Sequence, residues 1–278
     1  MVAAKLNLQK IISQFAKNYG KPGAPITTDP FELILLENIA YLVSDERRED
    51  AFAMLRKHAG TKPHEILSAS HDDILKATKL GGMHPEQRVS RLREIALIAM
   101  NEFEGDLKPA LRLPLPKAKQ ALRKFPSIGE PSAEKILLFT RSYPILGLDS
   151  NGLRVLVRLG FGEEKKNYPA TYRSVQEAIN DQLKKDYGWL INAHVLLRQH
   201  GKELCKTNRP LCDKCPVKRS CAYFQRTFVS VPLAVLTLMY HNQTQTHNQI
   251  ENHHHLRIPP VVMNHAAQEK SCKSAERA

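Results

Sequence analysis

The sequence predicts an all-α protein, on three observations. Apolar residues recur at the three- and four-residue spacing of a helix face through most of the first 224 residues. No stretch alternates apolar and polar residues convincingly, as a half-buried strand does. Segments rich in proline and glycine, such as 21–30 and 81–87, separate the periodic stretches as loops do. At 278 residues, the chain is long enough to bury a core in one large domain or two moderate ones.

The expected helices can be taken in chain order. An amphipathic segment at 6–20 comes first, and the segment 31–45 is apolar on nearly every side, as a helix buried in a bundle is. Residues 123–139, RKFPSIGEPSAEKILLF, predict the end of one helix, a tight turn and a second helix that begins near Pro131. The other predicted helices are 46–60, 62–70, 71–80, 88–103, 115–125, 151–161, 169–188 and 189–201.

The charge balance indicates a polyanionic partner. The chain has 41 Lys and Arg against 28 Asp and Glu, a net charge of +13, which favours nucleic acid over a membrane. Its longest apolar run, 228–240, is shorter than the roughly 20 residues of a membrane-spanning helix. The first residues lack the apolar run of a secretory signal. We therefore expect a cytoplasmic, nucleoid-associated protein without a signal peptide, whose thiols are reduced.

The composition changes after Phe224. Residues 241–260 are rich in Asn, Gln and His, and six of the twelve histidines lie between His241 and His265. Such a run is compatible with metal binding. A segment with so few apolar residues more often stays disordered, so we expect a tail at 225–278 without a defined site.

Four of the five cysteines fall within one short basic loop, CKTNRPLCDKCPVKRSC, with the spacing C-x6-C-x2-C-x5-C. In a reducing compartment such a group indicates a metal site rather than disulfides. Only one Cys-x2-Cys pair is present, whereas a zinc ribbon normally has two, so four thiolates favour a [4Fe–4S] cluster with zinc as the alternative. Lys214, Lys218 and Arg219 make the loop a candidate phosphate-binding surface. The expected ligands are Cys205, Cys212, Cys215 and Cys221.

Three motifs together resemble the endonuclease III superfamily of DNA glycosylases, which includes the A/G-specific adenine glycosylases. The cysteine spacing, preceded by His200 and Gly201, is similar to the family's cluster loop. FPSIGEPSAEKIL (125–137) resembles its helix-hairpin-helix, and LDSNGLRVLVR (148–158) resembles its aspartate-bearing helix start. The resemblance covers about 30–224, in the family's order.

The resemblance implies a two-lobed helix-hairpin-helix DNA glycosylase fold. A six-helix barrel lobe would comprise 30–142 and include the hairpin, and a second helical lobe of 1–29 plus 143–224 would hold the [4Fe–4S] cluster. The implied partner is double-stranded DNA that contains a damaged or mispaired base, bound by a monomer.

In a helix-hairpin-helix, the backbone N–H groups that open the second helix bind a DNA phosphate. Ile128 and Gly129 form the turn, and the glycine lets the backbone approach a phosphate oxygen without a Cβ. Lys124 and Lys135 are expected to reinforce this contact. An ordinary helix–helix corner is the alternative interpretation of this segment alone.

The residue at position 131 bears on whether base removal is followed by strand cleavage. Family members that also cut the strand carry a lysine there, which forms a Schiff base with the sugar. This chain has Pro131, which has no amine, so we predict a glycosylase without AP-lyase activity. Lys135, about one helical turn later, is a less favoured substitute.

Two carboxylates are the expected catalytic residues. By resemblance, Asp149 stabilises the positive charge that develops on the deoxyribose, although an N-cap role alone would also explain it. Glu37, a charged residue within an apolar helix, matches the glutamate that protonates the departing purine in adenine glycosylases. A buried carboxylate needs either a partner or a raised pKa, and a raised pKa would suit a general acid.

Two departures leave the excised base open. Adenine glycosylases carry a glutamine pair where this chain has Tyr41 and Leu42, and no Nudix-like domain fits into 225–278. Leu42, Met83 and His84 are candidates for the side chain that fills the gap left by the extruded base. We predict a monofunctional, adenine-type glycosylase of base excision repair. The alternatives are an endonuclease III-like pyrimidine or mismatched thymine/uracil glycosylase, with or without lyase activity, and a non-catalytic protein that binds damaged DNA.

Overall fold

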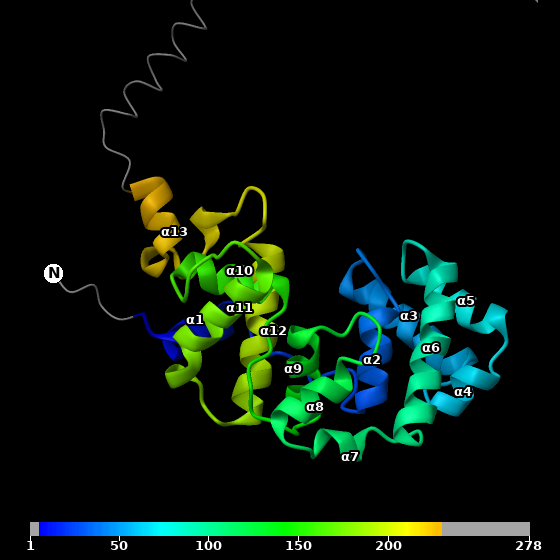
Figure 1. The fold of residues 1–278 in the computed structure, drawn as a ribbon. Coiled ribbons are helices and arrows are strands. Elements are labelled where there is room, and N and C mark those ends of the chain that lie inside the picture. Colours follow the sequence, from blue (N-terminus) through cyan, green and yellow to red (C-terminus); the bar gives the residue numbers. More distant parts are fainter. Residues whose placement is uncertain (1–5, 230–278) are drawn as a thin grey trace, which may run out of the picture. The chain divides into compact units, whose positions relative to one another are not determined.

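Helices joined by loops make up residues 6–229, the part of the chain that the computed structural model describes (Figure 1). Within these residues there is no β-strand, only one isolated bridge between Tyr41 and Gly82. None of the described helices combines the length and the apolar character needed to cross a membrane. The all-α prediction is confirmed.

The described α-helices are α1 (Leu8–Tyr19), α2 (Pro30–Asn38), α3 (Asp45–His58), α4 (Pro63–Ser68), α5 (His71–Leu80), α6 (Pro85–Phe103), α7 (Lys108–Leu111), α8 (Leu115–Leu122), α9 (Glu130–Phe139), α10 (Ser150–Leu159), α11 (Tyr168–Ile179), α12 (Tyr187–Glu203) and α13 (Ala222–Phe224). Short 3-10 turns are η1 (Asn180–Gln182), η2 (Cys212–Lys214) and η3 (Lys218–Ser220), and η4 (Gln225–Val229) is a π-helical turn.

Side-chain caps explain why several helices begin where they do. Asp29 accepts hydrogen bonds from the N–H groups of Phe31 and Glu32, and Pro30 occupies the first helical position of α2. Ser44 caps α3 and Asp186 caps α12 in the same way. Each such cap typically contributes about 1 kcal/mol.

Two predicted helices end earlier than the sequence pattern indicated. The segment 31–45 leaves the helix after Asn38, and Leu42 then adopts the left-handed conformation at φ 55°. The segment 169–188 ends at Ile179 and passes into η1. After α2, Ile39 and Ala40 are buried but Tyr41 and Leu42 are exposed, and after α11 residues 180–186 are mostly polar and exposed. Neither loop contains a proline or glycine that would mark the end of the helix in the sequence.

The first of two hydrophobic cores lies among α2 to α9. Its members include Ile34 and Leu35 of α2, Phe52 of α3 and Leu92 of α6, all of them almost fully buried. Because α2 is surrounded by the other helices, it is apolar on every side, as the sequence indicated.

The second core is built from α1, α10, α11 and α12. It contains Leu8, Phe15, Leu156 and Leu190. Helix α9 contributes to both cores, since Leu137 packs in the first and Leu138 in the second. In Figure 1, α8 and α9 lie between α2–α6 and the group α1, α10–α12. The lobe boundaries 30–142 and 143–224 stay a prediction.

Regular structure continues through η4 to Val229, past the boundary expected at residue 225. The rest of the predicted tail, residues 230–278 with the histidine-rich stretch and Cys272, lies outside the described residues.

Candidate functional site

Glu37 lies in the last turn of α2 and faces the first half of α9. Its Oε2 accepts a hydrogen bond from Ser132 Oγ at 3.0 Å, and its Oε1 is bound by the ammonium of Lys135. The side chains of Glu37 and Lys135 are only 19% and 20% exposed. Two residues almost a hundred positions from Glu37 therefore fix its carboxylate in place.

The pKa of Glu37 is shifted opposite to our expectation. Burial acts to raise it, but the positive charge and hydrogen bond of Lys135, the Ser132 hydroxyl and the charge of Arg48 together hold the pKa below its usual range. Glu37 is therefore ionised near neutral pH: of the two alternatives for a buried carboxylate, the structure supplies a partner, and the raised pKa is wrong. Lys135, expected at the DNA phosphates, is placed here against Glu37.

Asp149 caps α10. Its Oδ1 accepts from the backbone N–H of Gly152 at 2.7 Å, and its Oδ2 accepts from Asn151 Nδ2 at 3.0 Å. Arg198 Nε lies 3.4 Å from Oδ2, and the Asp149 side chain is 27% exposed. Asp149 therefore has the predicted capping role. Gly152, Asn151 and Arg198 fix the orientation of its carboxylate, which remains partly exposed to solvent.

Arg198 of α12 joins Asp149 to a third carboxylate, Asp45 of α3. Its Nη1 and Nη2 donate to the two oxygens of Asp45 at 2.8 and 2.5 Å, and Lys202 Nζ donates to Asp45 at 2.5 Å. These bonds to Arg198 hold the pKa of Asp45 well below its usual range. Sequence reasoning missed Arg198, because an arginine in an amphipathic helix is normally on the solvated face.

His194 of α12 is buried near Lys135 and Asp149. Its Nδ1 is 2.6 Å from the carbonyl oxygen of Gly147, and burial lowers its pKa to about 4, with the charge of Lys135 acting in the same direction and that of Asp149 against it. His194 is thus neutral and within electrostatic range of both. Glu37, Lys135, His194, Asp149 and Arg198 therefore gather where α2, α9, α10 and α12 meet.

The predicted hairpin joins α8 to α9. Ser127 makes the turn at φ 62°, Ile128 is buried with its N–H donating to Phe125 at 3.2 Å, and Gly129 precedes the first turn of α9. No described side chain caps this helix start. A Cβ on Gly129 would meet no described atom closer than Pro131 Cδ at 3.8 Å, so the space beside the glycine is open. Pro131 is in the first turn, where its missing N–H costs no helical bond.

Two charged side chains near the hairpin already have partners. The ammonium of Lys124 is paired with Glu102 and lies 5.7 Å from the centre of the Phe103 ring. Glu130, at the start of α9, accepts from Lys119 Nζ at 2.7 Å. A carboxylate at this position complements the helix dipole and competes with an approaching phosphate.

Three large apolar side chains project from two adjacent loops. Tyr41, Leu42 and Met83 are 59%, 75% and 54% exposed. The backbone N–H of Tyr41 donates to the carbonyl of Gly81 at 2.9 Å, which joins the α2–α3 loop to the α5–α6 loop. Exposed apolar side chains that gather in this way are typical of contact surfaces.

The two glycines of the second loop make this approach possible. A Cβ on Gly81 would lie 2.0 Å from the carbonyl oxygen of Ile39, and Gly82 has φ 92°. No bulkier residue fits at Gly81 unless one of the loops moves.

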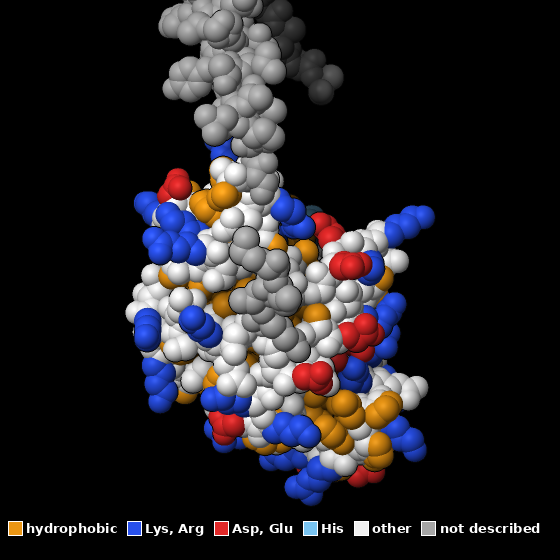
Figure 2. Space-filling model, turned by 90° about the vertical axis from the view of Figure 1, so that its left-hand side faces the viewer, with side chains coloured by type: hydrophobic (Ala, Val, Ile, Leu, Met, Phe, Trp, Pro, Cys, Tyr) orange, Lys and Arg blue, Asp and Glu red, His pale blue; other side chains and the backbone are white. Residues whose placement is uncertain are grey.

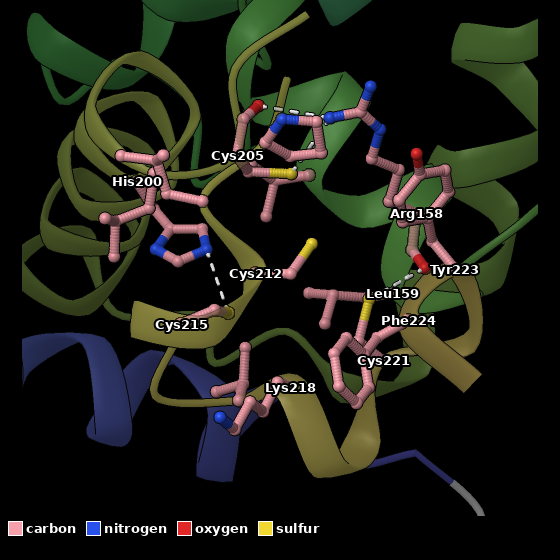
Figure 3. Close-up of a pocket in the computed structure, with 15 residues that line it drawn as sticks. Arg158, Leu159, His200, Cys205, Cys212, Cys215, Lys218, Cys221, Tyr223 and Phe224 are labelled. Carbon is pink, nitrogen blue, oxygen red and sulfur yellow. Dashed lines mark hydrogen bonds between the residues drawn. The ribbon is translucent and has the colours of Figure 1, made fainter. Parts of the chain in front are cut away.

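The four predicted ligands Cys205, Cys212, Cys215 and Cys221 line one pocket between α10, the end of α12 and α13 (Figure 3). All four are free thiols. Arg158 Nη1 is 3.4 Å from Cys205 Sγ, and its Nη2 donates to the carbonyl of Thr207 at 2.9 Å. His200 Nε2 is 3.6 Å from Cys215 Sγ. The donor set around the pocket is that of a thiolate-bound metal group.

The thiols do not converge on a single point. Among the residues that the structure describes, no three His, Cys, Asp or Glu side chains gather closely enough to hold one metal ion. Burial raises the pKa of Cys215 to about 11, so this thiol stays protonated at neutral pH in the absence of a metal.

The loop that carries these cysteines is basic and exposed. Lys214 and Arg219 are exposed, and Lys218 Nζ donates to the carbonyl of Asp213 at 2.9 Å. Figure 2 shows lysine and arginine side chains spread over the face that it draws. Such a surface attracts polyanions.

No family model matches the sequence, but curated relatives do. The chain is 26% identical over 218 residues to endonuclease III of Thermotoga maritima, covering 78% of this chain and 92% of the relative. It is 29% identical over 203 residues to endonuclease III of Sulfolobus acidocaldarius, covering 71% and 84%. The thymine-DNA glycosylase of Aeropyrum pernix is 22% identical over 223 residues, covering 78% and 94%.

Solved structures share the fold. A trapped covalent intermediate of endonuclease III with DNA matches with a TM-score of 0.62 and 18% identity, covering 80% of this chain and 98% of that one. A thermostable thymine-DNA glycosylase matches with a TM-score of 0.63 and 18% identity, covering 79% and 95%. The predicted fold class is confirmed.

Proposed function

Because the chain belongs to the helix-hairpin-helix DNA glycosylases of the endonuclease III superfamily, we propose that it hydrolyses the N-glycosidic bond of a base extruded from damaged or mispaired duplex DNA. One observation carries the proposal: Glu37 and Asp149, far apart in sequence, are both within the electrostatic reach of Arg198 where α2, α9, α10 and α12 meet. Two carboxylates beside a sugar are the groups that glycosidic cleavage requires.

Asp149 is proposed to stabilise the oxocarbenium-like transition state. Bonds from Gly152 and Asn151 hold its side chain in a fixed orientation, so little reorganisation is needed as charge develops. Its partial exposure leaves room for a sugar to approach.

Glu37 is proposed to accept a proton from the attacking water, because it is ionised before DNA binds. By resemblance, adenine remains the proposed base, and Glu37 would then need to take up a proton when the purine enters. A pyrimidine or mismatched thymine/uracil base is the second candidate, and the ionised state of Glu37 favours it. The relative named thymine-DNA glycosylase supports the same candidate.

We propose that strand cleavage does not follow base removal. Pro131 has no amine, and the ammonium of Lys135 is engaged by Glu37. Borohydride trapping on a duplex with an abasic site tests this point. No covalent adduct is expected, and an adduct that is lost in Lys135→Met would show that Lys135 acts as a lyase nucleophile.

Binding is proposed to use three surfaces of a monomer. The start of α9 at Ile128 and Gly129 receives a backbone phosphate, and the basic side chains of the cysteine loop receive another. Leu42 and Met83, both exposed, enter the stack where the base has left. The resulting substrate is double-stranded DNA at the nucleoid.

The four cysteines are proposed to hold a [4Fe–4S] cluster. They line one pocket, and four thiolates are the usual ligands of a [4Fe–4S] cluster. When bound, the cluster holds the basic loop in shape. Iron analysis and absorbance near 400 nm, roughly where cluster charge-transfer bands fall, test this, and stoichiometric zinc without iron would contradict it.

A panel of mismatched and oxidised duplexes tests the enzyme itself. We expect wild type to release a base from at least one duplex and Asp149→Asn to release it at least about 100-fold more slowly. DNA affinity should be nearly unchanged in the variant. If wild type and variant bind alike and neither releases any base, the protein is a damage-binding module instead.

A further inference from the structure

We propose that His200 and Tyr19 form a hydrogen-bond relay that sets the reduction potential of the cluster. The relay runs from α1 through α12 to Cys215. It rests on the cluster proposed above and not on the excised base or on the glycosylase mechanism.

His200 contacts Tyr19, Cys215 and Phe15 in the relay. The Tyr19 hydroxyl is 2.9 Å from His200 Nδ1, and His200 Nε2 is 3.6 Å from Cys215 Sγ. The imidazole is 2% exposed and stacks on Phe15, with 4.1 Å between ring centres and 20° between the planes. Figure 3 shows the ring of His200 directed at Cys215 from the side opposite Arg158. The ring therefore has one orientation.

Ligation of the cluster decides which nitrogen carries the proton. A cluster-bound Cys215 is a thiolate and has no proton to give, so the nitrogen that faces it must be the donor. A neutral imidazole has one N–H, which is then on Nε2 and leaves Nδ1 as an acceptor. Tyr19 satisfies this acceptor by donating its hydroxyl proton. Tyr19 thus selects the tautomer in which His200 donates to the cluster ligand.

A donor at the thiolate favours the reduced cluster. Each electron adds negative charge to the iron and sulfur atoms, and a hydrogen bond to a ligand sulfur stabilises that charge. Burial strengthens the bond, because water does not compete at a ring that is 2% exposed. Arg158 donates to Cys205 Sγ at 3.4 Å, so the two ligands are supported independently. Removal of the His200 donor is therefore expected to lower the potential.

Three variants separate donation from packing. His200→Leu removes the donor, His200→Gln keeps an N–H near the position of Nε2, and Tyr19→Phe removes only the group that selects the tautomer. Tyr187→Phe, at the other end of α12, is the control for loss of a tyrosine hydroxyl. Iron content and visible absorbance are measured first, and the potential is then determined by voltammetry on the full-length, cluster-loaded protein.

We expect a negative shift for His200→Leu, a smaller negative shift for Tyr19→Phe, and potentials near wild type for His200→Gln and Tyr187→Phe. If His200→Leu loads iron and keeps the wild-type potential, or if His200→Gln shifts as far as His200→Leu, the relay is wrong and His200 only fills space. If the wild type itself contains no iron, the cluster proposal fails instead.

A second measurement covers the case in which His200→Leu does not load. Long-range ¹H–¹⁵N correlation spectra of the oxidised wild-type protein report the tautomer of His200 directly. A protonated Nε2 that becomes mixed in Tyr19→Phe supports the relay. A protonated Nδ1 in the wild type overturns it.

Discussion

At the scale of single residues, Lys135 decides the protonation state of Glu37. Both side chains are about four-fifths buried, and burial alone would raise the pKa of the carboxyl group. The ammonium of Lys135 outweighs that effect. Chemistry that uses Glu37 as a base therefore depends on a lysine on another helix.

Lys135→Met should move the acidic limb of the pH–rate profile to higher pH. Without the ammonium, burial acts on Glu37 with less opposition, so its pKa rises and a larger share is protonated at a given pH. The measurement is the single-turnover rate of base release between about pH 5 and pH 9. Lys165→Met, which removes an exposed lysine paired with Glu163, is the matched control. An unshifted limb in Lys135→Met would mean that Glu37 does not govern it.

At the scale of secondary-structure elements, Asp45 connects α3 to α12. We expect Asp45→Asn to destabilise the protein by about 1 kcal/mol at pH 7, because both the carboxylate and Arg198 are roughly one-third exposed. The pKa of Asp45 is lowered in the folded state, so this contribution is present above the unfolded pKa of about 3.9 and is lost as the pH falls through the folded value.

Urea unfolding at pH 7 and at low pH measures this difference. The gap between wild type and Asp45→Asn should close in strong acid. Asp73→Asn, which breaks a local pair with Lys76 within α5, should cost less at pH 7. Equal effects of the two substitutions would show that the α3–α12 connection adds nothing.

The contact between the α2–α3 and α5–α6 loops also belongs to this scale. Gly81→Ala places a Cβ 2.0 Å from the carbonyl oxygen of Ile39, so we expect a loss of roughly 1–3 kcal/mol and weaker DNA binding as Leu42 and Met83 shift. Gly23→Ala is the control, since no described atom lies within 4 Å of its added Cβ. Thermal unfolding and duplex affinity measure the two effects, and a Gly81→Ala protein that matches Gly23→Ala in both would refute the contact.

Sequence patterns predicted the helices well, because burial on one face leaves a local period. They also predicted Asp149 before α10 and the four cysteines around one pocket. They missed the ends of α2 and α11, because no proline or glycine marks where these two helices stop. No sequence pattern predicts the pairing of Glu37 with Lys135 or of Asp149 with Arg198, because such contacts depend on how distant helices pack.

At the scale of the whole described molecule, the cysteine loop is attached to α10. Arg154 donates to the carbonyls of Gly201 and Cys205, and Arg158 donates to those of Lys206 and Thr207. Asp149 caps the start of the same helix. The loop and the candidate site therefore share one rigid element.

Chelation of the iron in the proposed cluster should therefore weaken DNA binding more than it reduces helix content. The loop between α12 and α13 contains only the 3-10 turns η2 and η3, so circular dichroism should change little. Loss of shape in the basic loop should lower duplex affinity and expose it to protease. Zinc-free, iron-depleted protein with full affinity and no new cleavage in the loop would contradict this expectation.

Helix α9 belongs to both hydrophobic cores, with Leu137 in one and Leu138 in the next. Unfolding of α9 would therefore expose apolar residues of both hydrophobic cores to water. Melting should accordingly be all-or-none, with the calorimetric and van 't Hoff enthalpies equal for the described part of the chain. Two resolved heat-absorption peaks from that part would mean that α9 does not tie the halves together.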